Sequence, residues 1–188
     1  MPPNDPPSRA PARRDTDGQR PVVAVDVDGD LNPSTPAAPQ RAATGSTPTR
    51  DPGPNGRHAT GAVWLNPHHG TWLLEIAEHA DPVWCSSWGQ RSATWIAPRL
   101  GLPTTWPVLD LPGPGGIRWG HQTKLGHLYR HTGTRPVAVL DDQIGGKDPD
   151  TAQRRTTAGV PTLLVPVDGV TGIRRQDVDA VLAWLHDR

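Results

Sequence analysis

The sequence predicts an α/β fold, a three-layer sandwich in which helices cover both faces of a five-stranded, mainly parallel sheet. Short apolar runs rich in β-branched residues alternate along the chain with longer segments of helical periodicity. Two of the apolar runs end abruptly in aspartates. Because ligands bind at the carboxyl ends of parallel strands, these observations together predict one sheet with an acidic site at its edge.

The composition is that of one domain and does not point to a charged partner. The 188 residues include 23 Pro, 20 Gly and 8 Trp but no Phe, so tryptophan must supply most of the aromatic packing. Lys plus Arg number 19, as do Asp plus Glu, so net charge does not favour nucleic acid or a membrane as a partner. The lone Cys85 excludes an internal disulfide, and no apolar run approaches the ~20 residues that span a bilayer. We expect a cytoplasmic protein; the sequence leaves its oligomeric state open.

Two polar tracts flank the first predicted strand. Residues 1–20 consist largely of Pro, Asp, Arg and Ser, which bury little apolar surface, and we expect them to be disordered. Residues 32–60 are rich in Pro, Ala, Thr and Gly and show no helical or alternating period. Because a tract of this length inside a domain is usually functional or disordered, we interpret it as a flexible flap or insert over the site.

The first predicted strand, Val22–Val25, is a run of four apolar residues that suits a buried place in a sheet. Asp26, Asp28 and Asp30 follow it directly, with Gly29 between the last two. Carboxylates this close together repel one another and attract a cation, and hard oxygen ligands suit Mg²⁺. We therefore expect a cation site where this strand ends.

The next two predicted elements are a short strand and a helix. Residues 61–65 form an apolar run, interpreted as a strand that returns from the flap. Residues 71–80 are expected to form an amphipathic helix, because their apolar side chains recur on one stripe. That stripe consists of Trp72, Leu73, Ile76 and Ala77.

The second and third strands of the sheet are expected at residues 82–85 and 106–109. The second strand ends in Ser86 and Ser87, and residues 88–100 indicate a helix that ends before Gly101. Either serine can cap that helix or bind an anion. Ser86 directly follows the apolar run and is the preferred candidate.

Residues 121–131 indicate a helix that carries Lys124 in its first turns and ends at Gly133. A lysine on a helix is usually just solvated, but the chain has only one other, Lys147. The loop before this helix contains Trp119, which is a candidate platform for a substrate because no predicted apolar face requires it.

The fourth strand, residues 135–140, repeats the pattern of the first: Arg-Pro, an apolar run, and then the aspartates Asp141 and Asp142. A chain that twice brings a buried strand to an acidic end is expected to place those ends side by side. The remaining predicted elements are a helix over residues 148–159, a fifth strand over 160–165 and an amphipathic helix over 176–188.

Reactive groups thus occur at four strand ends or helix starts. In chain order they are Asp26 and Asp28, then Ser86, then Lys124, then Asp141 and Asp142. This series resembles the haloacid dehalogenase (HAD) superfamily, whose phosphohydrolases have a D-x-D-G motif after the first strand, a Ser or Thr after the second, a Lys at a later helix and an acidic pair after the fourth. The resemblance spans residues 21–165. It implies a Rossmann-like sheet with a minimal cap domain or none, and one phosphatase domain over residues 21–188.

The resemblance also implies a role for each of these residues. Asp26 is the nucleophile that forms an aspartyl-phosphate, and Asp28 is the general acid and base. Ser86 hydrogen-bonds a phosphoryl oxygen, while Lys124 offsets negative charge. The implied ligands of Mg²⁺ are the Asp26 carboxylate, the Asp28 main-chain carbonyl, Asp141 and Asp142.

Four further residues complete the expected site. Gly29 permits the turn that aims backbone N–H groups at the phosphate, and Ser87 is an alternative phosphate-binding hydroxyl. Trp119 is the candidate substrate platform. Asp30 stands where such proteins usually have an uncharged residue.

The predicted function is Mg²⁺-dependent hydrolysis of a phosphomonoester, such as a nucleotide or a polynucleotide end. The W-L-N-P-x-H-G segment that begins at Trp64 is also similar to a bacterial branch related to the phosphatase domains of RNA-repair systems. Three alternatives remain open: a metal-dependent nuclease or phosphodiesterase, a non-catalytic phosphate-binding module on the same fold, and a D-x-D sugar-nucleotide transferase. The last leaves Lys124 and the Asp141 pair unexplained.

Overall fold

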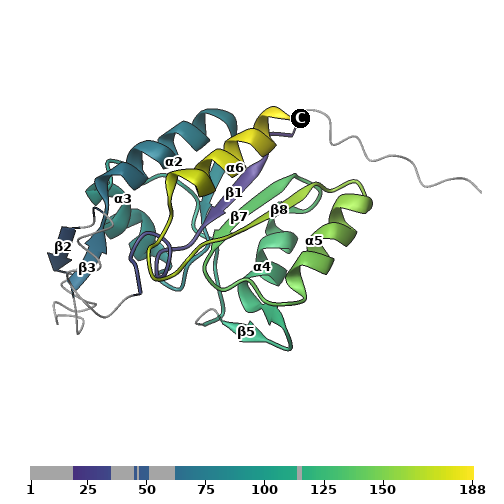
Figure 1. Ribbon diagram of the computed structural model, residues 1–188, viewed down its shortest axis with the longest axis horizontal. Helices are drawn as coiled ribbons and strands as arrows, with labels where there is room; N and C mark the ends of the chain where they lie inside the picture. The colour runs from purple at the N-terminus through teal and green to yellow at the C-terminus, as the bar shows by residue number, and fades with distance from the viewer. Residues whose placement is uncertain (1–18, 35–44, 46, 51–61, 114–115) are drawn as a thin grey trace, which may run out of the picture.

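Four parallel strands form the central sheet of the computed structural model, which describes residues 19–34, 45, 47–50, 62–113 and 116–188 (Figure 1). The strand order is β4-β1-β7-β8, and every neighbouring pair is parallel. The strands are β1 (Val22–Val25), β4 (Asp81–Trp84), β7 (Val137–Asp141) and β8 (Thr162–Pro166). The α/β class and the mainly parallel sheet are therefore as predicted.

The prediction of a full third strand over residues 106–109 is wrong, because this segment makes only one bridge to the sheet. Val108 bridges to Trp84 at the outer edge of β4. Trp84 donates its N–H to the carbonyl of Pro107 at 2.9 Å, and Leu109 donates to the carbonyl of Trp84 at 2.8 Å. The Pro107 carbonyl faces β4, but Pro107 has no N–H with which to extend this ladder towards the start of β4.

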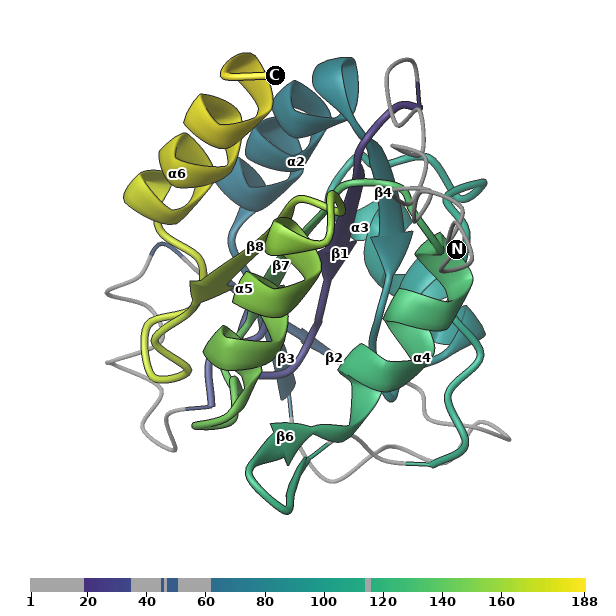
Figure 2. The same ribbon diagram turned by 90° about the vertical axis from the view of Figure 1, so that its right-hand side faces the viewer.

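Helices cover both faces of the sheet, as Figures 1 and 2 show. One face carries α2 (Pro67–His79), the π-helical segment η2 (Ser92–Ile96) with α3 (Ala97–Arg99), and α6 (Arg175–His186). The other carries α4 (Thr123–Thr132) and α5 (Asp148–Thr157). Since successive strand residues point to opposite faces, Val23 and Val25 pack in one apolar cluster and Val22 and Ala24 in another.

Local capping explains where the helices begin and end. α2 starts at Pro67, four residues before the predicted helix, because Asn66 caps it and Pro67 suits a first helical position. The Asn66 side chain accepts a hydrogen bond from the N–H of His68 at 3.0 Å. Gly101 and Gly133 follow α3 and α4 with φ of +68° and +59°, the left-handed conformation expected of a glycine after a helix.

Two short hairpins lie outside the sheet. β2 (Thr47–Arg50) pairs antiparallel with β3 (Ala62–Leu65), and β5 (Ile117–Arg118) pairs with β6 (His121–Gln122). β2 falls within residues 32–60, where no regular structure was predicted. Most of the other residues of the predicted flap lie outside those that the structure describes.

The predicted disordered segment, residues 1–20, also lies outside the described residues except at its end. There Arg20 forms an ion pair with Asp81 at 2.8 Å. Among the described residues, no helix combines the length and apolar character needed to cross a membrane.

Candidate active site

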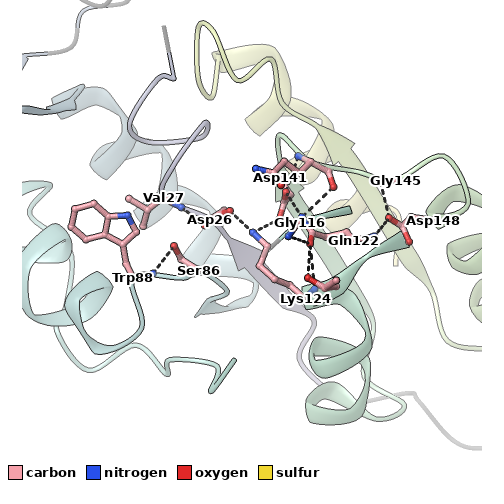
Figure 3. Close-up of polar contacts among 12 residues, drawn as sticks. Asp26, Val27, Ser86, Trp88, Gly116, Gln122, Lys124, Asp141, Gly145 and Asp148 are labelled. Atoms are coloured by element: carbon pink, nitrogen blue, oxygen red, sulfur yellow. Dashed lines mark hydrogen bonds and ion pairs between the residues drawn. The ribbon is translucent and has the colours of Figure 1, made fainter. Parts of the chain in front are cut away.

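The strands β1 and β7, whose carboxyl ends carry aspartates, lie next to each other in the sheet. A buried lysine contacts the aspartates of both. Val25 on β1 pairs with Leu140 on β7, so Asp26 and Asp141 occupy the next position on neighbouring strands. The Nζ atom of Lys124, from the first turn of α4, contacts Asp26 and lies 2.7 Å from Oδ2 of Asp141 (Figure 3). All three side chains are buried. The sheet register and α4 therefore assemble one compact charged cluster.

Three carboxylates of this cluster can hold a cation. Asp26, Asp141 and Asp142 each offer an oxygen, and these oxygens all lie within 4.8 Å of one another. Oδ1 of Asp142 is buried and has no hydrogen-bond partner among the described residues. Carboxylate oxygens are the ligands that Mg²⁺ prefers, and three of them exceed the single positive charge of Lys124. The residues present thus fit a hard divalent cation.

The Asp142 carboxylate is held where two backbone segments come close without side chains. A Cβ atom on Gly29, which has φ of +83°, would lie 2.2 Å from Cγ of Asp142. A Cβ atom on Gly169 would lie 2.7 Å from Oδ2 of Asp142. Glycine at these two positions therefore lets Asp142 reach the cluster. Gly29 is needed not only for the turn expected from the sequence but also because any side chain there would clash with Asp142.

Replacement of Gly29 with alanine is expected to destabilise the protein more than the same change at Gly159. Gly159 has nearly the same φ, +84°, but a Cβ atom there would meet nothing within 4 Å. Each substitution carries about 1–2 kcal/mol for the left-handed backbone. Gly29→Ala adds a clash with Asp142, worth about 1–3 kcal/mol more. Urea unfolding of both variants measures the difference, and equal losses would refute the close packing of Asp142.

Burial and neighbouring charges set the protonation of the cluster. Burial acts to lower the pKa of Lys124, but the carboxylates of Asp26 and Asp141 outweigh it and raise that pKa above its usual value. Burial raises the pKa of Asp26, and contact with the Lys124 ammonium opposes the rise. A bound divalent cation would oppose it further. The cluster thus contains a permanent ammonium ion and carboxylates that a cation can keep ionised.

Asp30 is a fully buried acid whose pKa is raised by its surroundings. Its side chain is 0% exposed, and neither carboxylate oxygen has a hydrogen-bond partner among the described residues. Burial, and then the charges of Asp26, Asp141 and Asp142, raise the pKa of Asp30 well above its usual value. The same environment therefore favours the protonated, uncharged form of Asp30, which would not repel an incoming anion.

Asp28 lies outside the group of cation-binding carboxylates, on the exposed side of the loop. Its Oδ2 accepts a hydrogen bond from the indole N–H of Trp88 at 2.8 Å, and its Oδ1 accepts one from the Asn32 amide at 2.9 Å. Asn32 also accepts the N–H of Trp64 at 2.9 Å, which ties the β2–β3 hairpin to this loop. Both oxygens of Asp28 are therefore held in place, one by a side chain of its own loop and one by Trp88, which follows β4.

The two serines after β4 occupy different environments. Ser86 is 1% exposed, and its Oγ accepts the N–H of Trp88 at 3.3 Å. Its hydroxyl also acts to lower the pKa of the Asp26 carboxyl. Ser87 is exposed and lines a pocket beside the cluster. Ser86 thus adjoins the candidate nucleophile, while Ser87 faces the approach to it.

Trp119 is not brought to the cluster. It lies at the tip of the β5–β6 hairpin, 79% exposed, with the guanidinium of Arg118 5.9 Å from its ring centre. Its φ of +56°, and that of Gly120, +85°, suit the tight turn of a two-residue hairpin. Its ring contact among the described residues is with Arg118 rather than with the cluster, so its role as a substrate platform stays a prediction.

Gln122 was missed by sequence reasoning, although it links the charged residues. Its Nε2 donates to Oδ1 of Asp141 at 3.3 Å and to the carbonyl of Gln143 at 3.1 Å. Its Oε1 accepts the N–H of Lys124 at 3.3 Å and so caps α4. Gln122 therefore holds the helix that supplies Lys124 against the strand that supplies Asp141, but its residue type alone gave no signal of this.

Asp148 was also missed, having been predicted only as the start of a helix. This buried carboxylate accepts hydrogen bonds from the N–H groups of Gln122 at 2.8 Å and Gly145 at 2.7 Å, and pairs with Nδ1 of His121 at 2.9 Å (Figure 3). It thereby joins the β5–β6 hairpin to the loop after β7. The sequence Gly-Gly-Lys-Asp-Pro was the available signal, and it equally suits an ordinary helix start.

Comparison of the chain with protein-family models, with curated proteins and with solved structures finds no match. The likeness to the HAD superfamily therefore stays a prediction from motifs, and the geometry of the site carries the functional inference.

Proposed function

We propose that this protein is a Mg²⁺-dependent phosphomonoesterase of the HAD type that works through an aspartyl-phosphate on Asp26. The observation that carries this proposal is the cluster of Asp26, Lys124, Asp141 and Asp142. A phosphomonoester dianion resists attack by a carboxylate until positive charge neutralises it. Lys124 supplies one such charge next to Asp26, and the three carboxylates can bind a cation that supplies the rest.

The residues divide the reaction into two displacements. An oxygen of Asp26 forms a bond to phosphorus while the bond from phosphorus to the leaving oxygen breaks, and Asp28 gives that oxygen a proton. Asp28 then takes a proton from a water molecule that attacks the phosphoaspartate, which releases phosphate and restores Asp26. Mg²⁺, when bound, offsets charge on the phosphoryl oxygens. Lys124 does the same and holds Asp26 in position for attack.

Cys85, the only cysteine of the chain, is a poorer candidate nucleophile than the Asp26 carboxylate. Cys85 is 2% exposed, and burial raises the pKa of its thiol to about 12. A thiol that stays protonated is a poor nucleophile. Asp26 is therefore the better candidate for a covalent phosphoenzyme.

The direct test is phosphate release from phenyl phosphate and from a panel of nucleotides, sugar phosphates and phosphorylated oligonucleotides, with Mg²⁺ or with EDTA. We expect Mg²⁺-dependent release and an acid-stable phosphoenzyme whose phosphate maps to Asp26. Cleavage of phosphodiesters without a phosphoenzyme would instead support a nuclease. Binding of Mg²⁺ and phosphate without turnover across the panel would support a non-catalytic module.

The stabilisation by Mg²⁺ is expected to weaken progressively below about pH 6. Burial, and then the carboxylates of Asp141 and Asp26, raise the pKa of Asp142 from 3.8 to about 6. A protonated carboxyl cannot bind the cation, so apparent Mg²⁺ affinity should fall about tenfold per pH unit below that pKa.

The metal-free protein should respond to pH in the opposite direction. Because folded Asp142 keeps its proton to a higher pH than unfolded Asp142, this group favours folding more as pH falls from above 6 towards 4. Thermal melts with and without Mg²⁺ at pH 7.5, 6.5 and 5.5 measure both effects. An equal Mg²⁺-induced rise in Tm at pH 5.5 and 7.5 would count against Asp142 as a ligand.

Loss of the Trp88 indole N–H is expected to slow hydrolysis of alkyl phosphates about tenfold, because Trp88 orients the acid that protonates the leaving oxygen. Aryl phosphates, whose leaving groups need less protonation, should be affected less. Trp95 provides a matched control: it stacks on Trp88 at 5.9 Å, but its own N–H has no partner among the described residues. Steady-state rates of Trp88→Phe and Trp95→Phe test this. If both variants lose alkyl and aryl activity equally, Trp88 has only a packing role.

A further inference from the structure

A pocket of about 440 Å³ lies beside the charged cluster, at the same edge of the sheet. Its wall includes Ser86 and Ser87, directly after β4, and the segment that follows the bridge at Val108. Cys85, the residue before Ser86, donates its N–H to the carbonyl of Val25, the residue before Asp26, so the pocket lies near the candidate nucleophile. Its volume lies in the lower part of the range of about 300–1,000 Å³ typical of small-molecule sites.

The side chains that line this pocket are partly apolar and partly hydrogen-bonding. Val108, Leu109 and Leu111 supply an apolar wall, while Gln90 and Asp110 supply polar groups. A carboxylate accepts hydrogen bonds from hydroxyl or amino groups, and an amide both donates and accepts them. A ring with hydroxyl or amino groups at its edge matches this lining.

The charge of the pocket lining favours an uncharged leaving group over a negatively charged one. Among the described residues that line the pocket, Asp110 is the charged one, and none is lysine or arginine. A second phosphate, or the backbone of a polynucleotide, would meet a carboxylate here and no cation. Like charges in a partly enclosed site repel, whereas an uncharged group can use the same carboxylate as a hydrogen-bond acceptor.

We propose that this pocket binds the leaving group of the substrate, and that this group is an uncharged nucleoside, so that the preferred substrates are nucleoside monophosphates. The proposal rests on the phosphatase function proposed above. It favours a free nucleotide over a polynucleotide end, and it makes Asp110 a residue that determines specificity.

The test compares adenosine 5′-monophosphate with adenosine 5′-diphosphate as substrates. Their leaving groups share the same ring system but differ in charge, because the first releases adenosine and the second releases adenosine monophosphate. We expect kcat/KM for the monophosphate to exceed that for the diphosphate at least tenfold. The variant Asp110→Lys should reduce this ratio at least tenfold, since it replaces repulsion of the second phosphate by attraction.

The controls separate this proposal from the one on which it rests. Asp150→Lys, at an exposed position on α5, makes the same charge change away from the pocket and should leave the ratio unchanged. If phenyl phosphate is not hydrolysed, the phosphatase function itself fails. If phenyl phosphate is hydrolysed, three results would each overturn the nucleoside pocket alone: equal rates for the two nucleotides, an unchanged ratio in Asp110→Lys, or faster hydrolysis of a 5′-phosphorylated oligonucleotide than of the monophosphate.

Discussion

Replacement of Asp26 with asparagine is expected to lower Mg²⁺-dependent phosphate release by a factor on the order of 10³ or more. The amide has nearly the same shape as the carboxylate but cannot form the phosphoenzyme. Its loss of charge also weakens the group of three carboxylates that can hold the cation. Steady-state kcat with phenyl phosphate, together with acid-quenched phosphoenzyme, measures the effect.

The Asp26→Asn variant should remain folded, which makes the loss of activity interpretable. Lys124 keeps its ion pair with Asp141 at 2.7 Å, so the ammonium is not left without a partner. Asp150→Asn, at an exposed position, is the control for removal of one carboxylate elsewhere. Full activity in the Asp26→Asn variant would refute the assignment of Asp26 as the nucleophile.

Replacement of Lys124 with methionine is expected to destabilise the metal-free protein by about 3–5 kcal/mol. Lys124 has 4% of its side chain exposed, and it separates two carboxylates that are themselves buried, Asp26 and Asp141. Methionine keeps the length of the side chain but leaves those carboxylates without a buried positive charge. Urea unfolding in EDTA measures the free energy lost.

Mg²⁺ should restore part of this stability, because the cation replaces the missing positive charge between the carboxylates. The same variant should lose activity even with Mg²⁺, since the cation alone does not supply the charge that Lys124 places next to the nucleophile. Lys147→Met is the matched control, because the other lysine of the chain is exposed. A Lys124→Met protein as stable in EDTA as the wild type would show that the buried ion pairs contribute little.

Much of the fold follows from local patterns in the sequence. The parallel strands β1, β4, β7 and β8 each appear as short apolar runs, and the helices between them show a clear apolar stripe or a glycine stop. The segment at residues 106–109 has the same apolar pattern but makes only one bridge, because Pro107 lacks the N–H that a regular ladder needs. Apolar pattern predicts burial, whereas a ladder also requires an N–H at each position that faces the neighbouring strand.

The candidate site was predictable to a lesser degree. The aspartates after two strands predicted the carboxylate group, since parallel strands end at the same edge of a sheet. Gln122 and Asp148 were missed because a buried polar network has no periodicity and consists of ordinary polar residue types. Trp119 was selected as an unassigned aromatic residue; it lies at an exposed hairpin tip, and its role as a substrate platform stays a prediction.

The order of chemical groups along this chain, and the short-range geometry around each, can be obtained from the sequence, because neighbours in a strand, turn or helix are positioned by local backbone preferences. Whether those groups meet depends on strand register and on helix packing across the sheet. Lys124 and Asp26 are 98 positions apart, and no local rule relates them. Their contact, the burial that raises the pKa of Asp30, and the close approach of Gly29 to Asp142 exist only once the sheet and its helices have packed together.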